Sequence, residues 1–277
     1  MKTGIFSDGM AWASMGEGEK VAILIPGGPG NPHPGEGMLA KLNFKPMRGL
    51  MDDGYRLVCV ARRRNVPEGH SIASMAADYA NMIEREFGGR VALVVGSSYG
   101  GIIAQYLAAD HPHCFQHIVV HVAACEIRPE GRDIDYAYAK AVSEGQRFGA
   151  GVAIAPGLFP DSKFPRVMKL FSGILGLLSA GQHQSYRRDI LIEGQAEKDF
   201  SATDILSRIK VPVCIIAGDQ DFYFPKELTL LTHEGIEGST LIMYEGQGHV
   251  AAAMNKNLSQ DILDYVRSTP PVYSATL

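Results

Sequence analysis

Short apolar runs alternate with segments of helical periodicity along most of the chain. The apolar runs predict buried strands at residues 21–25, 56–61, 91–95, 115–122, 211–217 and 240–244. Apolar positions that recur every three or four residues predict helices at 71–87, from 98 onward, and at 202–209, 225–233 and 250–267. Strands that lack polar positions are buried on both faces, and strands separated by helices form a parallel sheet between helical layers. The pattern therefore predicts an α/β fold.

Two stretches depart from this alternation. Residues 31–45 are rich in glycine and proline, which predicts a loop. Residues 126–200 are interpreted as helices and loops. The most apolar of these helices carries Leu170, Phe171, Ile174, Leu175, Leu177 and Leu178. These side chains line a hydrophobic pocket for a substrate or pack onto the body of the domain, or one side packs while a few of them line a cleft.

The sequence Gly96-Ser97-Ser98-Tyr99-Gly100 lies between a predicted strand and the helix that follows it. In a sharp turn from strand to helix, this pattern places the serine hydroxyl at the top of the sheet. The flanking glycines are needed because a Cβ atom would clash in so tight a turn. A plain glycine- and serine-rich turn is the alternative for the motif alone. Its position makes Ser98 a candidate nucleophile and predicts acyl transfer.

A serine hydroxyl needs a base, and an acid that orients the base, before it can attack a carbonyl. The segments Gly218-Asp219-Gln220-Asp221 and Gly248-His249 each follow a later predicted strand. Because the carboxyl ends of parallel strands meet at one edge of the sheet, both segments are expected near Ser98. On this argument either Asp219 or Asp221 can be the acid. Each can also be a turn residue or a helix cap.

These segments, in this order, resemble the α/β-hydrolase fold family of serine hydrolases, a group that includes esterases, prolyl aminopeptidases and C–C bond hydrolases. The resemblance rests on Pro26-Gly27-Gly28-Pro29-Gly30 and on residues 71–78, 96–100, 218–221 and 248–249. It implies a mostly parallel, doubly wound sheet with a small helical cap inserted after the sixth strand. The hydrolase core is then expected at residues 1–125 and 201–277, and the cap at 126–200.

The resemblance also implies roles for individual residues. In the family the acid usually stands three residues after the glycine of its segment, which selects Asp221 over Asp219. His249 is then expected to take the proton from Ser98 while Asp221 holds the imidazole in the correct tautomer. The run at residues 26–30 is similar to that of prolyl aminopeptidases, although Pro26 stands where they carry a histidine.

Backbone N–H groups of Gly28 and Tyr99 are expected to form the oxyanion hole, aided by the positive end of the helix after Ser98. A serine triad needs no cofactor. The expected function is hydrolysis of a small carboxylic ester or related acyl compound through an acyl-enzyme. The alternatives are cleavage of a C–C bond, a lactone, or an amide or peptide by the same triad, or a non-catalytic member of the fold that binds a small ligand.

Composition and charge indicate one domain and do not favour binding to nucleic acid or a membrane-spanning segment. The chain has 277 residues, of which 46% are hydrophobic and 20% charged, which suits one domain with a sizeable core. The formal net charge is −4, and the run Arg62-Arg63-Arg64, interpreted as a solvated or ion-paired loop, does not predict nucleic-acid binding. Residues 1–8 lack the apolar core of a signal peptide, and no run is long enough to span a membrane. The expected protein is cytoplasmic and acts on a small molecule as a monomer or homodimer.

Cysteine and histidine positions do not favour a metal site. Cys59, Cys114, Cys125 and Cys214 are scattered in apolar segments, as reduced core cysteines are. His113, His117 and His121 share the parity of one strand, with His111 close by. No carboxylate is placed to complete a ligand set with them, so we expect no metal.

Overall fold

The structure is a computed structural model, and it describes residues 1–30, 44–178 and 187–272. These residues contain an eight-stranded sheet in the order β1-β2-β4-β3-β5-β6-β7-β8. Its strands are β1 (Lys2–Ile5), β2 (Ala11–Met15), β3 (Lys20–Ile25), β4 (Tyr55–Val60), β5 (Val91–Ser97), β6 (Phe115–His121), β7 (Val213–Gly218) and β8 (Thr240–Tyr244). Strand β2 is antiparallel to β1 and β4, and every pairing from β4 to β8 is parallel. The predicted α/β class and mostly parallel sheet are confirmed.

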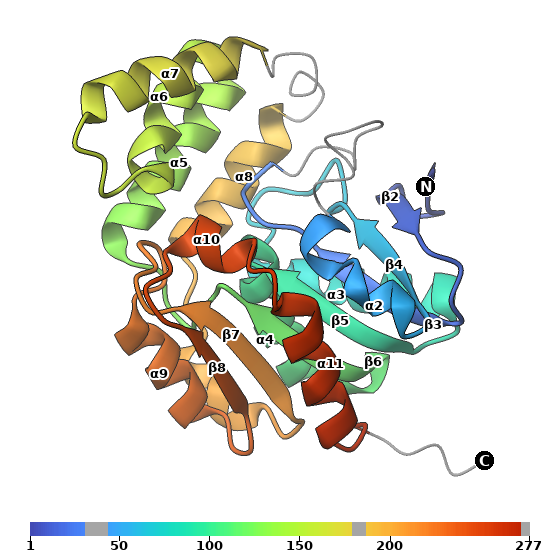
Figure 1. The fold of residues 1–277 in the computed structure, drawn as a ribbon. Coiled ribbons are helices and arrows are strands. Elements are labelled where there is room, and N and C mark those ends of the chain that lie inside the picture. Colours follow the sequence, from blue (N-terminus) through green and yellow to red (C-terminus); the bar gives the residue numbers. More distant parts are fainter. Residues whose placement is uncertain (31–43, 179–186, 273–277) are drawn as a thin grey trace.

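Helices cover both faces of this sheet (Figure 1). One layer contains α3 (Ile72–Phe87), α4 (Tyr99–Asp110), η2 (Pro112–Cys114), η4 (Thr203–Arg208) and α9 (Lys226–Gly235). The other layer contains η1 (Lys45–Met47), α2 (Gly49–Asp52), α10 (His249–Ala253) and α11 (Leu258–Ser268). Successive strand residues point to opposite layers: Val94 packs in the first, while Leu93 and Val95 pack in the second. This alternation explains why the central strands contain so few polar residues.

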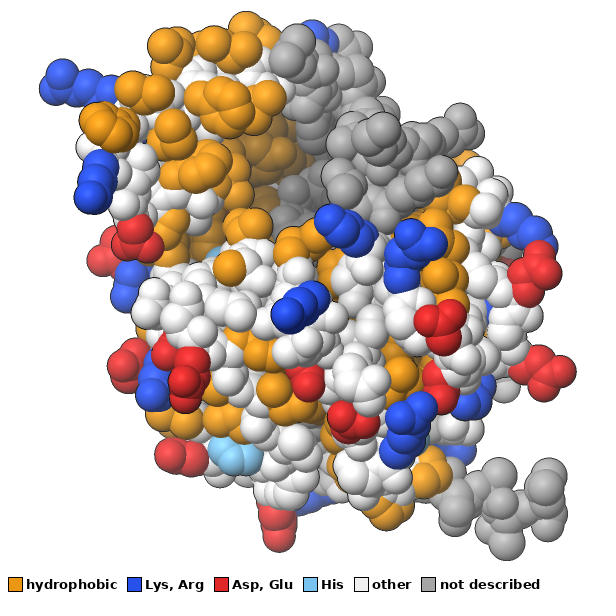
Figure 2. Space-filling view, in the orientation of Figure 1, with side chains coloured by type: hydrophobic (Ala, Val, Ile, Leu, Met, Phe, Trp, Pro, Cys, Tyr) orange, Lys and Arg blue, Asp and Glu red, His pale blue; other side chains and the backbone are white. Residues whose placement is uncertain are grey.

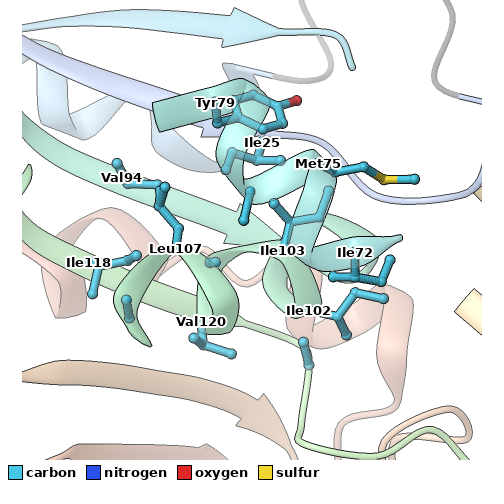
Figure 3. Close-up of a cluster of buried hydrophobic side chains, with 14 of the residues drawn as sticks. Ile25, Ile72, Met75, Tyr79, Val94, Ile102, Ile103, Leu107, Ile118 and Val120 are labelled. Atoms are coloured by element: carbon cyan, nitrogen blue, oxygen red, sulfur yellow. The ribbon is translucent and has the colours of Figure 1, made fainter. Parts of the chain in front are cut away.

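The first layer fixes the strand-to-helix turn that carries Ser98. Figure 3 shows Ile102, Ile103 and Leu107 of α4 directed at side chains of the sheet and of α3. Helix α3 begins where the Ser71 hydroxyl accepts the N–H of Ser74 at 3.2 Å. The α4 layer is therefore a rigid support, and the residue at its N-terminus is held firmly above the sheet.

The chain segment that connects β6 to β7 forms a set of helices that projects beyond the sheet (Figure 1). These inserted helices are α5 (Pro129–Ser143), α6 (Arg147–Leu158), α7 (Pro165–Leu178) and α8 (Arg187–Lys198). They follow the sixth strand, where the sequence predicts a cap at 126–200. The division of the chain into a core and a separate cap domain stays a prediction. No helix in the described ranges is long and apolar enough to cross a bilayer.

Three details differ from the prediction, and a fourth cannot be compared. The single helix expected at 250–267 is two helices, because the Asn255 side chain accepts the N–H of Asn257 at 2.8 Å and ends the first. The segment 202–209 is a 3-10 helix at Thr203–Arg208. Strands β1 and β2 carry no long apolar run and were not predicted. The loop expected at 31–45 falls mostly outside the described residues.

The apolar helix expected within 126–200 is α7, and most of its large side chains are about half exposed. Leu170, Phe171, Ile174 and Leu177 are between 47% and 55% exposed. Leu175 is also half exposed, but it lines a cavity of about 260 Å³ among the inserted helices. The side chain of Leu178 is outside the described residues. Leu175 thus lines a cavity, as one of the alternatives expects, whereas Leu170, Phe171, Ile174 and Leu177 stay half exposed.

Candidate active site

The turn between β5 and α4 holds Ser98 in a strained backbone conformation. Its φ of 53° and ψ of −116° are rarely adopted by residues other than glycine. A Cβ on Gly96 would collide with the Gly100 carbonyl, and one on Gly100 would collide with the Ile25 carbonyl. The glycines are thus required by close backbone approach, as the motif predicts. The surrounding packing keeps the Ser98 hydroxyl at the carboxyl edge of the sheet.

The structure joins Ser98, His249 and Asp221 by hydrogen bonds. His249 Nε2 lies 3.0 Å from Ser98 Oγ, and His249 Nδ1 lies 2.6 Å from Asp221 Oδ2. The second oxygen of Asp221 accepts the backbone N–H groups of Tyr223 at 2.8 Å and Phe224 at 3.1 Å. These bonds and full burial of the carboxylate fix its direction toward the imidazole.

Asp219, the other candidate acid, has a different position. Its Oδ1 accepts the N–H of Gly246 at 2.7 Å. Gly246 belongs to the turn between β8 and α10 that carries His249. Asp219 therefore binds the turn that precedes His249, while Asp221 contacts the imidazole itself.

Two aromatic rings pack on the His249 imidazole. The Phe224 ring is stacked on it with centroids 5.9 Å apart, and the Tyr223 centroid lies 5.2 Å away. The Tyr223 hydroxyl donates to Asp135 on α5 at 3.1 Å. This contact ties the inserted helices to the histidine's surroundings. Asp135 was not predicted from the sequence, although it falls on the same helical face as the buried Ala139 and Val142.

Burial leaves two carboxyls of the inserted helices poorly solvated. It raises the pKa of Asp135 to about 6. It also holds the pKa of Glu197, on α8, well above its usual range, and the nearby Asp135 charge adds to the effect. These groups bind protons more readily than ordinary surface carboxyls. The region behind Tyr223 therefore has less negative charge at neutral pH than its composition suggests.

Arg62 organises the loop that faces Ser98. Gly27 lies so close that a Cβ there would be 3.0 Å from Ser98 Cβ. Arg62 is only 2% exposed, and it donates to the Pro26 carbonyl at 3.0 Å and to the Gly28 carbonyl. Both carbonyls are thereby turned toward the guanidinium.

Glu193 of α8 completes this arrangement. Its Oε2 accepts from Arg62 Nε at 2.9 Å and from the Gly30 N–H at 2.6 Å. The guanidinium carbon also lies 4.3 Å from the centroid of the Tyr99 ring, whose hydroxyl donates to the Glu193 carbonyl at 2.8 Å. For the arginine run the sequence predicts either an ion-paired or a solvated loop. Arg62 is ion-paired and buried, so the first alternative is correct for this residue. Nothing in the sequence pairs Arg62 with a glutamate 131 positions away.

The histidines considered as metal ligands do not converge. His113 lies in η2, outside the strand. His117 Nε2 lies 3.0 Å from the Thr269 carbonyl, and His121 Nδ1 lies 3.0 Å from the Ser97 hydroxyl. Among the residues that the structure describes, no three histidine, cysteine or acidic side chains are grouped as metal ligands.

His121 gives a prediction about stability. Burial lowers its pKa from 6.5 to about 4. Below pH 6.5 the unfolded chain therefore binds a proton that the folded chain refuses, so the stability present above pH 6.5 is lost as the pH falls toward 4. Measured by chemical denaturation, wild type should lose about 3 kcal/mol relative to His121→Asn between neutral pH and pH 4. A difference in unfolding free energy that stays constant with pH would contradict this account.

A cavity of about 440 Å³ adjoins the imidazole. It is lined by His249, Val250 and Phe222 on one side and by Leu158, Phe159 and Pro160 of the inserted segment on the other. Figure 2 shows hydrophobic side chains bordering a hollow between the inserted helices and the rest of the molecule. Asp161, Ser162 and Gln220 also line the cavity, so a small molecule with both polar and apolar groups can reach His249 from this side.

Comparison with known proteins gives consistent matches. A model of the alpha/beta hydrolase family matches residues 22–257. A pimeloyl-[acyl-carrier protein] methyl ester esterase from Neisseria meningitidis serogroup C is 26% identical over 173 residues, which cover 56% of this chain and 61% of that protein. The matched region thus spans less than two thirds of this relative.

Solved structures show the same fold at low sequence identity. MGS-M2, an alpha/beta hydrolase from a Medee basin deep-sea metagenome library, superposes with a TM-score of 0.74 at 15% identity and 100% coverage of both chains. The esterase EaEST from Exiguobacterium antarcticum gives 0.68 at 20% identity, covering 95% of this chain and 97% of its own. The enol-lactonase from Burkholderia xenovorans gives 0.70 at 14% identity, covering 94% and 96%.

Proposed function

Because the chain belongs to the alpha/beta hydrolase family, we propose that it is a serine hydrolase that cleaves a small carboxylic ester or related acyl compound. The observation that carries the proposal is the continuous hydrogen-bond path from Asp221 through His249 to Ser98. A ligand-binding protein has no need of a buried acid aligned on a histidine that in turn contacts a strained serine. The matched relative named as a methyl ester esterase agrees with an ester substrate.

The reaction follows from the positions of these groups. His249 Nε2 accepts the proton as Ser98 Oγ bonds to the acyl carbon, and the carbonyl oxygen becomes an oxyanion. Asp221 stabilises the imidazolium that forms. The imidazolium then donates its proton to the leaving alcohol, which departs as the carbonyl reforms. In the second half, His249 takes a proton from water, which attacks the acyl-enzyme and releases the acid and free Ser98.

The oxyanion needs donors that are already in place. We assign this role to the backbone N–H groups of Gly28 and Tyr99. Tyr99 is the first residue of α4, so its N–H lies at the positive end of the helix. Gly28 has a φ of +69° in the loop whose carbonyls Arg62 holds, which frees the opposite face of that loop for N–H donation. Preorganised donors of this kind contribute about 3 kcal/mol each to transition-state stabilisation.

A substrate panel tests the bond type. Short-chain p-nitrophenyl and methyl esters, a lactone, a vinylogous diketone and an aminoacyl anilide would be compared at equal enzyme concentration. We expect the esters to have the highest kcat/KM, and His249→Gln to lower it by about 10³-fold or more. Preferential cleavage of the diketone, lactone or anilide would replace the ester assignment with the corresponding alternative. A folded protein that cleaves none of them would support a non-catalytic ligand-binding role.

A further inference from the structure

Helix α7 carries its large apolar side chains on the outside of the molecule. Phe164, Val167, Leu170, Phe171, Ile174 and Leu177 are between 47% and 68% exposed, and we call them the α7 apolar face. Figure 2 shows hydrophobic side chains gathered over the part of the molecule where Figure 1 places α6 and α7. Contiguous apolar surfaces of this kind mark sites of contact with a membrane or another macromolecule.

Small residues fill the opposite side of this helix. A Cβ on Gly151 of α6 would collide with the Ser172 carbonyl of α7. In the same way, Gly176 meets the Arg147 carbonyl and Gly173 meets the Phe148 ring. The two backbones approach closely at Gly151 and Gly176, and the Phe148 ring of α6 packs over Gly173. Helices in lipid pack in the same way. Small residues lie between them, and large apolar residues face the surrounding acyl chains.

The charged residues near the α7 apolar face favour one kind of binding partner. Residues 147–178 contain four cations, Arg147, Lys163, Arg166 and Lys169, all exposed, and a single acid, Asp161. The whole chain is negative, at −4. An interface between proteins is usually depleted of lysine, whereas lysine and arginine beside an apolar helical face are typical of helices that lie at a membrane surface. The charge pattern therefore complements an anionic bilayer.

We propose that α7 docks in the surface of an anionic phospholipid bilayer, with the α7 apolar face among the acyl chains and the four cations at the headgroups. Helix α7 lies at the outer end of the inserted helices, so it can reach a flat surface ahead of the sheet (Figure 1). Leu158 and Phe159 line both the cavity beside α7 and the cavity at His249. Docking therefore places the bilayer next to a route toward His249. The proposal does not depend on the hydrolase reaction.

Vesicle co-sedimentation tests the docking. Wild type is expected to bind vesicles of phosphatidylcholine mixed with phosphatidylglycerol, and to bind weakly to phosphatidylcholine alone. Added salt should weaken binding. Reversing two charges in Arg166→Glu/Lys169→Glu should reduce partitioning by about thirtyfold or more, given the contribution of each cation near such a surface. Phe171→Ser/Ile174→Ser should abolish it. Leu231→Ser is the matched control, because Leu231 on α9 is 44% exposed but lies outside the face.

Sedimentation velocity and thermal melting of the same variants complete the experiment. Unchanged melting temperatures would show that the variants fold and that the loss belongs to the surface. The proposal is overturned if wild type ignores the anionic vesicles, or if the Phe171→Ser/Ile174→Ser variant binds as well as Leu231→Ser. It is also overturned if the face instead joins two copies of the chain, seen as a wild-type dimer that these substitutions convert to monomer.

Discussion

Replacing Ser98 by alanine is expected to reduce kcat for an ester by about 10⁴-fold or more, because Ser98 is the proposed nucleophile. Stability should respond differently. Alanine at position 98 keeps a Cβ in the strained conformation with φ 53°, whereas glycine adopts that φ freely. We therefore expect Ser98→Gly to be more stable than Ser98→Ala by about 1 kcal/mol, measured by urea denaturation.

Ser97 supplies the matched control for this experiment. Its hydroxyl lies one residue away but bonds to His121 rather than to His249. Ser97→Ala should retain kcat within a few-fold of wild type. If Ser98→Ala keeps wild-type turnover, or if Ser97→Ala loses as much activity as Ser98→Ala, the assignment of the nucleophile is wrong.

The Arg62→Met variant is expected to lose both stability and activity. It leaves the Glu193 carboxylate, which is 1% exposed, without its closest cation; Arg64 Nη1 remains 3.8 Å from the other oxygen. Removing one partner of a buried pair costs about 3 kcal/mol. The carbonyls of Pro26 and Gly28 also lose their donor, so kcat should fall by about 10²-fold as the loop loosens.

A double variant separates the two effects. Arg62→Met/Glu193→Leu removes both charges of the closest pair, so part of the lost unfolding free energy should return, although the Gly30 N–H then loses its Glu193 acceptor. The loop carbonyls still lack a donor, and kcat should therefore stay low. Recovery of kcat together with stability would mean that Arg62 only stabilises the folded protein, and that it does not position the loop of residues 26–30 for catalysis.

The sequence predicts those parts of the molecule that depend on local spacing. The central strands and the Ser98 turn follow from apolar runs and close backbone packing, which neighbouring residues determine. The adjacency of His249 and Ser98 follows from parallel strands ending at one edge. The choice of Asp221 needed the family resemblance, because spacing alone left Asp219 open.

Contacts between distant segments could not be predicted in this way. The pairing of Arg62 with Glu193 and the bond from Tyr223 to Asp135 depend on how the inserted helices sit over the sheet. Helix α7 also differs from the usual case, in which the apolar face of a helix packs onto the protein core. Its glycines pack inward against α6, so its large side chains are left outside. Hydrophobic periodicity identifies the apolar face of a helix but not the surface that the face contacts.

Labelling with a fluorophosphonate, followed by peptide mapping, is the first experiment for Ser98 as the nucleophile. The reagent reports whether a serine is activated, and it needs no knowledge of the substrate. We expect one adduct, on Ser98, that is absent in Ser98→Ala, slowed in His249→Gln and unchanged in Ser97→Ala. A folded wild-type protein that forms no adduct, or forms one on a different serine, would contradict this role of Ser98.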